Sequence, residues 1–129
     1  MSAEQYVRAL YGLALSPDGH LLGDSEIEMR PIMRGPRRAY TRAITVAEVV
    51  DLSKEDVGKG WNVYNGVHLR ERGTHKGGNQ QIRHLVAVFC DIDCVKQGIS
   101  KDQGAAAANG MPWGPPSMLV DSGGGLHGY

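Results

Sequence analysis

The sequence feature that most constrains the fold is an apolar run followed at once by two acidic residues. Residues 85–90 read Leu-Val-Ala-Val-Phe-Cys and lead directly into Asp91-Ile92-Asp93. A continuous apolar run of this length, with valine and phenylalanine in it, is typical of a strand buried on both faces. We therefore predict a strand buried on both faces over His84–Asp93, the strongest strand signal in the sequence.

Two carboxylates close this predicted strand. Side chains alternate between the faces of a strand, so Asp91 and Asp93 would lie on one face, roughly 7 Å apart. Two carboxylates side by side are costly to desolvate without a counter-charge, and Mg²⁺ and Mn²⁺ prefer oxygen ligands. Such an arrangement would suit a Mg²⁺ or Mn²⁺ site for nucleotidyl transfer. The alternative is a pair of solvated carboxylates at a strand end.

A glycine-rich segment follows near the end of the chain, Ser122-Gly123-Gly124-Gly125-Leu126-His127. Consecutive glycines let the backbone approach a ligand closely and expose N–H groups to an anion. The candidate nucleotide-binding residues are Ser122, Gly123, Gly124, Gly125 and His127, with His127 donating a hydrogen bond to a phosphate. The alternative is a flexible glycine turn with an incidental histidine.

Periodicity and turn signals predict the other elements. Helices are expected at Glu4–Tyr11, from the N-cap Thr45 to about Asp56, and over residues 100–109 with Ser100 as N-cap. Strands are expected at Glu26–Ile32, at Arg38–Ile44 as its partner, at Trp61–Leu69, at Ser117–Asp121 and from His127 onward. We expect one α+β domain over residues 1–129, with a mixed or antiparallel sheet packed against helices.

The charge is balanced overall but unevenly distributed. The 129 residues include 14 basic and 14 acidic side chains, which argues against non-specific nucleic-acid binding by the whole surface. One basic cluster, without an acid among its members, consists of Arg34, Arg37, Arg38 and Arg42; a second group consists of Arg70, Arg72, Lys76, Arg83 and Lys96. Each group either steers phosphates or is an ordinary solvated surface.

The two cysteines and the hydropathy bear on the compartment. In a strand, Cys90 and Cys94 would be about 13 Å apart, too far for a disulfide, so we expect reduced thiols in a cytoplasmic protein. Together with His68 and His75 they fit no usual zinc spacing. No apolar stretch reaches about 18 residues, so no membrane-spanning helix or membrane partner is expected.

The order of these motifs is more specific than any one of them. An apolar strand ends in Asp-x-Asp, a helix follows, and Pro116–Asp121 leads into Ser122–Tyr129. This order resembles the archaeo-eukaryotic primase superfamily, particularly its plasmid- and phage-type primase-polymerases. Residues 61–67 (Trp-Asn-Val-Tyr-Asn-Gly-Val) also resemble a strand that the family places upstream, so the resemblance covers roughly Glu26–Tyr129.

The resemblance implies a primase-polymerase core that makes primers from nucleoside triphosphates on a single-stranded DNA template during DNA replication. It implies Asp91 and Asp93 as catalytic metal ligands and His127 as the residue that contacts the incoming nucleotide's phosphates. Ser122 or Gly125 would be the small residue of the second motif.

The family's third motif, an acidic residue on a later strand, has no confident counterpart before Tyr129. We therefore expect an incomplete catalytic core, truncated after the second motif, that can be inactive alone and can work with a helicase domain or subunit. Two other functions stay open. One is a non-catalytic nucleic-acid or nucleotide-binding module, and the other is a metal-dependent nuclease.

Overall fold

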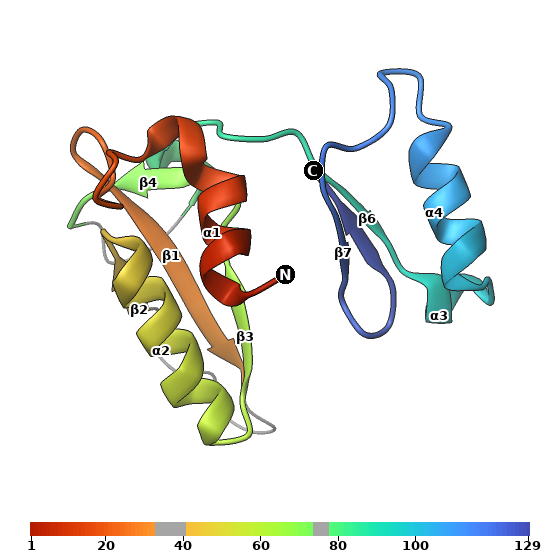
Figure 1. The fold of residues 1–129 in the computed structure, drawn as a ribbon, viewed down its shortest axis with the longest axis horizontal. Helices are drawn as coiled ribbons and strands as arrows, with labels where there is room; N and C mark the ends of the chain where they lie inside the picture. The colour runs from red at the N-terminus through yellow and green to blue at the C-terminus, as the bar shows by residue number, and fades with distance from the viewer. Residues whose placement is uncertain (33–40, 74–77) are drawn as a thin grey trace. The chain divides into compact units, whose positions relative to one another are not determined.

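A computed structural model describes residues 1–32, 41–73 and 78–129, which form two compact units (Figure 1). One unit is Met1–Val86 and the other is Ala87–Tyr129. Each unit combines helices with a sheet, and the strands that pair within the described residues run antiparallel. The predicted α+β class is therefore confirmed. The sequence showed no clear boundary at Val86.

The helices of the first unit begin where the sequence places caps. Helix α1 (Ala3–Tyr11) is followed by a 3₁₀ turn, η1 (Gly12–Ala14), and helix α2 spans Val46–Gly58. At the start of α2 the Glu48 N–H donates to Thr45 Oγ1 at 3.1 Å, and the Glu48 carboxylate accepts from the Thr45 N–H at 3.2 Å. This reciprocal cap confirms the predicted start of the helix at Thr45.

The first unit has a five-stranded sheet. Its strands are β1 (Ser25–Ile32), β2 (Thr41–Ala43), β3 (Asn62–Asn65), β4 (Leu69–Glu71) and β5 (Ile82–His84), and a 3₁₀ turn, η2 (Asn79–Gln81), precedes β5. The order is β2-β1-β4-β5, with β3 also paired to β1. The predicted strand over Trp61–Leu69 is divided into β3 and the start of β4. Strand β2 lies within the predicted Arg38–Ile44, of which residues 38–40 are outside the described ranges.

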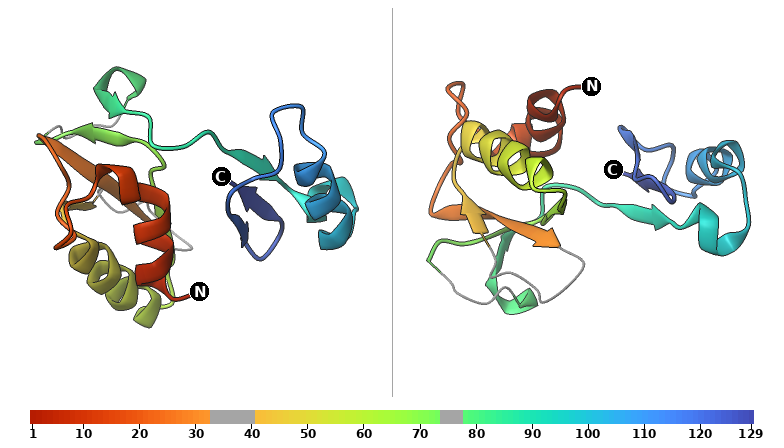
Figure 2. Two further views of the ribbon diagram at one scale, coloured as in Figure 1. Left: turned by 45° about the horizontal axis from the view of Figure 1, so that its top comes forward. Right: turned by 90° about the horizontal axis from the view of Figure 1, so that it is seen from below.

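One face of this sheet is covered by helices. Helices α1 and α2 both lie on the same side of β1 (Figure 2). The residues of β1 that alternate onto one face, Ile27 and Met29, are almost completely buried, as is Tyr11 of α1. Burial of each such side chain stabilises the fold by about 1.5–3 kcal/mol relative to exposure. The other face of β1 carries Glu26 and Glu28, which are also buried.

The second unit is a three-stranded sheet with two helices. Its elements are β6 (Cys90–Ile92), α3 (Cys94–Gln97), α4 (Lys101–Asn109), β7 (Leu119–Asp121) and β8 (Leu126–Gly128), and the sheet order is β6-β8-β7. Ser100 caps α4, as predicted. A Cβ on Gly104 would lie 2.7 Å from Cys94 Sγ and 3.3 Å from Leu126 Cδ1. The glycine therefore lets α4 pack closely on the sheet.

The prediction of a long buried strand over His84–Asp93 is wrong. Strand β5 ends at His84 and β6 covers only Cys90–Ile92. Between them, Leu85 and Val88 have 75% and 80% of their surface exposed. A strand requires a hydrogen-bonding partner along its length, and of residues 85–93 only Cys90–Ile92 pair with another strand, β8. Apolar composition alone does not supply that partner.

Within the described ranges, none of the helices combines the length and the apolar character needed to cross a membrane.

Candidate active site

Asp91 and His127 lie side by side on neighbouring strands. The register of β6 and β8 pairs them directly, and His127 Nε2 is 3.5 Å from Asp91 Oδ1. Their neighbours Ile92 and Leu126 face α4, so strand alternation places Asp91 and His127 on the opposite, open face of the sheet. The Asp91 side chain is 64% exposed. The fold thus brings together two candidate residues from separate motifs.

Asp93 is positioned differently from Asp91. It is the first residue after β6 and forms the N-cap of α3, where its Oδ1 accepts the Lys96 N–H at 3.0 Å. Strand alternation therefore does not decide where the Asp93 carboxylate points, since the strand ends at Ile92. A helix cap fixes the side chain at the edge of the sheet instead.

The predicted glycine loop is the turn between β7 and β8. The Ser122 N–H donates to the Gly125 carbonyl at 3.0 Å, and Gly123 has a φ of +89°, which favours glycine. A Cβ on Gly125 would lie only 2.0 Å from the Ile92 carbonyl oxygen. At least two of the three glycines therefore have a role in the fold. Nucleotide binding by Ser122–Gly125 stays a prediction.

The same turn holds an ion pair. Lys101 Nζ lies 2.6 Å from Asp121 Oδ1 and 2.5 Å from Oδ2, and the Gly123 N–H donates to Oδ1 at 2.8 Å. The contact with Lys101, followed by that with Gly123, lowers the pKa of the Asp121 carboxyl below its ordinary value. A depressed carboxyl pKa stabilises the folded state at neutral pH, and this contribution is lost as the pH falls through the folded-state pKa.

Replacement of Lys101 by glutamine is expected to raise the pKa of Asp121 toward its ordinary value, because the first cause of the depression is removed. A carbon-detected NMR titration of the carboxyl below about pH 5 measures it. Lys96→Gln, in α3, is the matched control and should leave the pKa of Asp121 unchanged. An equal titration curve in wild type and Lys101→Gln would contradict this assignment.

The described arginines of the two basic groups lie in ion pairs of the first unit. Arg70 Nε is 2.5 Å from Glu28 Oε2, Arg42 contacts Glu26, and Arg83 Nη2 is 2.5 Å from Glu71 Oε1. Carboxylates already partner these guanidinium groups, so they offer a phosphate less charge than the sequence suggests. Arg72 Nε lies 3.5 Å from Asp24 Oδ1, and Lys96 is an exposed residue of α3 in the second unit. Arg34, Arg37, Arg38 and Lys76, which were also predicted to steer phosphates, lie outside the described residues.

Among the described residues, no group of three or more His, Cys, Asp or Glu side chains is placed to hold a metal ion. Cys90 and Cys94 are free thiols, and His75 is not among the described residues. Mg²⁺ commonly takes one or two carboxylates and completes its shell with water and substrate phosphates. Asp91 and Asp93 offer ligands of this type, and metal binding by them stays a prediction.

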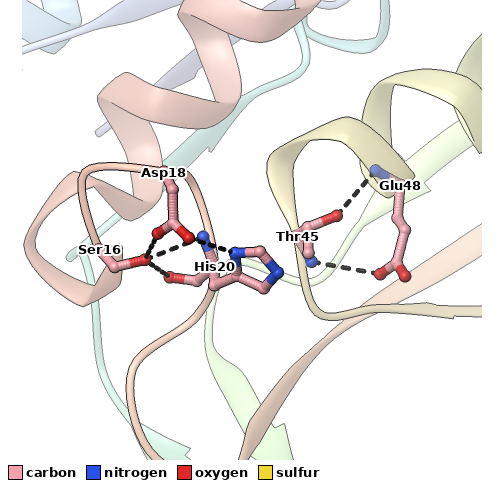
Figure 3. A network of polar contacts seen from close by, with 5 residues as sticks. All are labelled: Ser16, Asp18, His20, Thr45 and Glu48. Carbon is pink, nitrogen blue, oxygen red and sulfur yellow. Dashed lines mark hydrogen bonds and ion pairs between the residues drawn. The ribbon is translucent and has the colours of Figure 1, made fainter.

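A Ser-Asp-His cluster that sequence reasoning did not single out lies in the first unit (Figure 3). The Ser16 hydroxyl contacts the Asp18 carboxylate, and Asp18 Oδ2 is 3.0 Å from His20 Nδ1. The contact with Ser16 is the main cause that lowers the pKa of Asp18. An activated serine needs its base within hydrogen-bonding reach, whereas here the His20 ring contacts Asp18. The cluster closes the turn between Leu15 and Leu21.

Comparisons with models of protein families, with curated proteins and with solved structures each found no match. The resemblance to the primase superfamily therefore rests on the residues and their order in this chain.

Proposed function

We propose that this chain carries part of the active site of a DNA primase-polymerase that acts in replication priming. The observation that supports this best is the pairing of Asp91 with His127 across β6 and β8. By the motif resemblance, Asp91 is a metal ligand and His127 contacts the phosphates of the incoming nucleotide. Here these two side chains are 3.5 Å apart on one open face.

The proposed reaction is template-directed nucleotidyl transfer. The 3′-hydroxyl of a primer attacks the α-phosphate of a nucleoside triphosphate, a new P–O bond forms, and pyrophosphate leaves. Asp91 and Asp93 would hold Mg²⁺ or Mn²⁺, which supplies positive charge against the negative charge that develops at the reacting phosphate. His127 donates a hydrogen bond to the triphosphate. Single-stranded DNA is the template, and a helicase domain or subunit is a further proposed partner.

A non-catalytic nucleotide-binding module is the second candidate. It is favoured because, in the described parts of the chain, no third acid joins Asp91 and Asp93 in a metal-binding group. Such a module would bind the metal and the triphosphate through the same residues but would form no phosphodiester bond.

Metal titration tests both candidates. The double variant Asp91→Asn, Asp93→Asn is expected to bind Mn²⁺ at least about tenfold more weakly than wild type, because both carboxylate ligands are lost. Electron paramagnetic resonance of free Mn²⁺ measures it. Asp102→Asn, which removes one exposed carboxylate from the first turn of α4, is the control and should bind normally. Equal Mn²⁺ binding by the double variant and wild type would sink both candidates.

A primer-synthesis assay separates the primase-polymerase from the binding module. Wild type is incubated with single-stranded DNA, labelled nucleoside triphosphates and Mn²⁺. A labelled product that disappears in the double variant supports the enzyme. Metal and nucleotide binding without product supports the binding module.

A further inference from the structure

The open face of the second sheet carries a second row of side chains beside Asp91 and His127. The register pairs Cys90 with Gly128, so Phe89 lies across from Tyr129 one residue further along. The centroids of the two rings are 6.4 Å apart with a tilt of 33°. Phe89 is 51% exposed and offers a large apolar surface beside the polar side chains of Asp91 and His127. The face therefore has an aromatic row and a polar row.

The backbone of the sheet holds this aromatic row in place. The Tyr129 N–H donates to the Met118 carbonyl at 2.9 Å, and the Met118 N–H donates to the Tyr129 carbonyl at 3.1 Å. The Tyr129 ring stands edge-on to the His127 ring, with centroids 6.5 Å apart and an angle of 84° between the planes. Antiparallel hydrogen bonding of β8 to its neighbouring strands thus places the Phe89–Tyr129 pair next to the Asp91–His127 pair.

We propose that Phe89 and Tyr129 bind the base of the nucleoside triphosphate whose phosphates contact His127, an inference that rests on the function proposed above. Side chains two residues apart on a strand are separated by about 7 Å. A sugar bridges a comparable separation between a base and its α-phosphate. The aromatic row, Phe89 and Tyr129, would contact the base, and the polar row, Asp91 and His127, would contact the metal and the phosphates.

Stacking on these rings would not select among the bases. Every base has a π face, so an aromatic platform, here the Phe89 and Tyr129 rings, tolerates all of them. The platform therefore accepts any nucleoside triphosphate and leaves the choice of base to the template, as template-directed transfer requires.

Calorimetric titration of the full chain tests the platform with two probes, ATP and inorganic tripolyphosphate, each with Mn²⁺. Phe89→Ala and Tyr129→Ala are expected to weaken ATP binding about tenfold, the loss of one stacking contact, and to leave tripolyphosphate binding unchanged. Tyr129→Phe keeps the ring and should bind ATP like wild type. Trp113→Ala removes an exposed aromatic ring from the segment between α4 and β7 and is the matched control.

The outcomes separate this inference from the proposed function. ATP affinity that is unchanged in folded Phe89→Ala and Tyr129→Ala overturns the platform. Wild type that binds tripolyphosphate as tightly as ATP overturns it too, while the phosphate-binding role of His127 and the metal survives. Wild type that binds neither probe overturns the proposed function, and the platform with it. Amide NMR spectra of each variant establish that it is folded.

Discussion

Glu28→Gln is expected to lower the free energy of unfolding of the Met1–Val86 unit by about 3 kcal/mol. The Glu28 side chain is only 4% exposed, and its carboxylate contacts both Arg70 and Arg30. Glutamine keeps the shape and removes the charge. The Arg70 guanidinium, whose side chain is 11% exposed, then loses its counter-charge in a poorly solvated site.

Repulsion between arginines adds to this cost. Burial, and then the nearby charge of Arg70, lower the pKa of Arg42 below its ordinary value. The two guanidinium groups therefore repel each other across β1, and the buried carboxylates of Glu26 and Glu28 offset that repulsion. The loss of one of these carboxylates leaves more of the repulsion uncompensated.

Native-state hydrogen exchange of the α1 and β1 amides measures this change in the first unit alone. Glu55→Gln is the matched control, because Glu55 is 60% exposed and pairs with Lys59 on the surface of α2. An exposed pair of this kind contributes about 0–1 kcal/mol. An equal decrease in the free energy of unfolding of the two variants would show that the buried ion pairs of Glu28 do not contribute the stability assigned to them.

Gly125→Ala is expected to destabilise the Ala87–Tyr129 unit by about 3 kcal/mol, at the upper end of the usual cost of overpacking. The new methyl group would lie 2.0 Å from the Ile92 carbonyl oxygen, a backbone atom that cannot move without a shift of β6. Such a shift also disturbs the pairing of Asp91 with His127, so Mn²⁺ binding and any primer synthesis should decrease with it.

Gly124→Ala is the control for this substitution. The nearest atom to its added Cβ is Val95 Cγ2 at 3.9 Å, and its φ is not positive. We expect a change within about 0.5 kcal/mol, as for an ordinary surface substitution. Hydrogen exchange of the Leu126 and His127 amides measures both variants. Equal stability of Gly124→Ala and Gly125→Ala would refute the close packing of Gly125 on β6.

Helices α1, α2 and α4 were predicted because their signals are local, whereas α3 (Cys94–Gln97) was not predicted. Thr45 and Glu48 are three residues apart, and the hydrogen bonds between them depend on little else in the molecule. The same holds for Ser100, which caps α4 through the Gln103 N–H. Strand β1 was also predicted, over Glu26–Ile32, because apolar and charged residues alternate there.

The apolar run before Asp91 was a misleading signal because strand formation is not local. A strand exists only where another strand supplies hydrogen bonds, and composition does not name that partner. Asp93 shows the same limit, because the chain leaves β6 before it and uses its carboxylate as a helix cap. The burial of Glu26 and Glu28 was not predicted either, since it depends on arginines from β2 and β4.

The sequence by itself determined the α+β class, the starts of α2 and α4, and the candidate residues Asp91, Asp93 and His127. These follow from residue types and short spacings, which do not depend on how distant parts of the chain pack together. Only the tertiary structure decided that Asp91 faces His127, that Gly125 must lack a Cβ, and that Phe89 lies across from Tyr129. Each of these depends on the register of β6 against β8, two strands that are distant in the sequence and that pack together against α4.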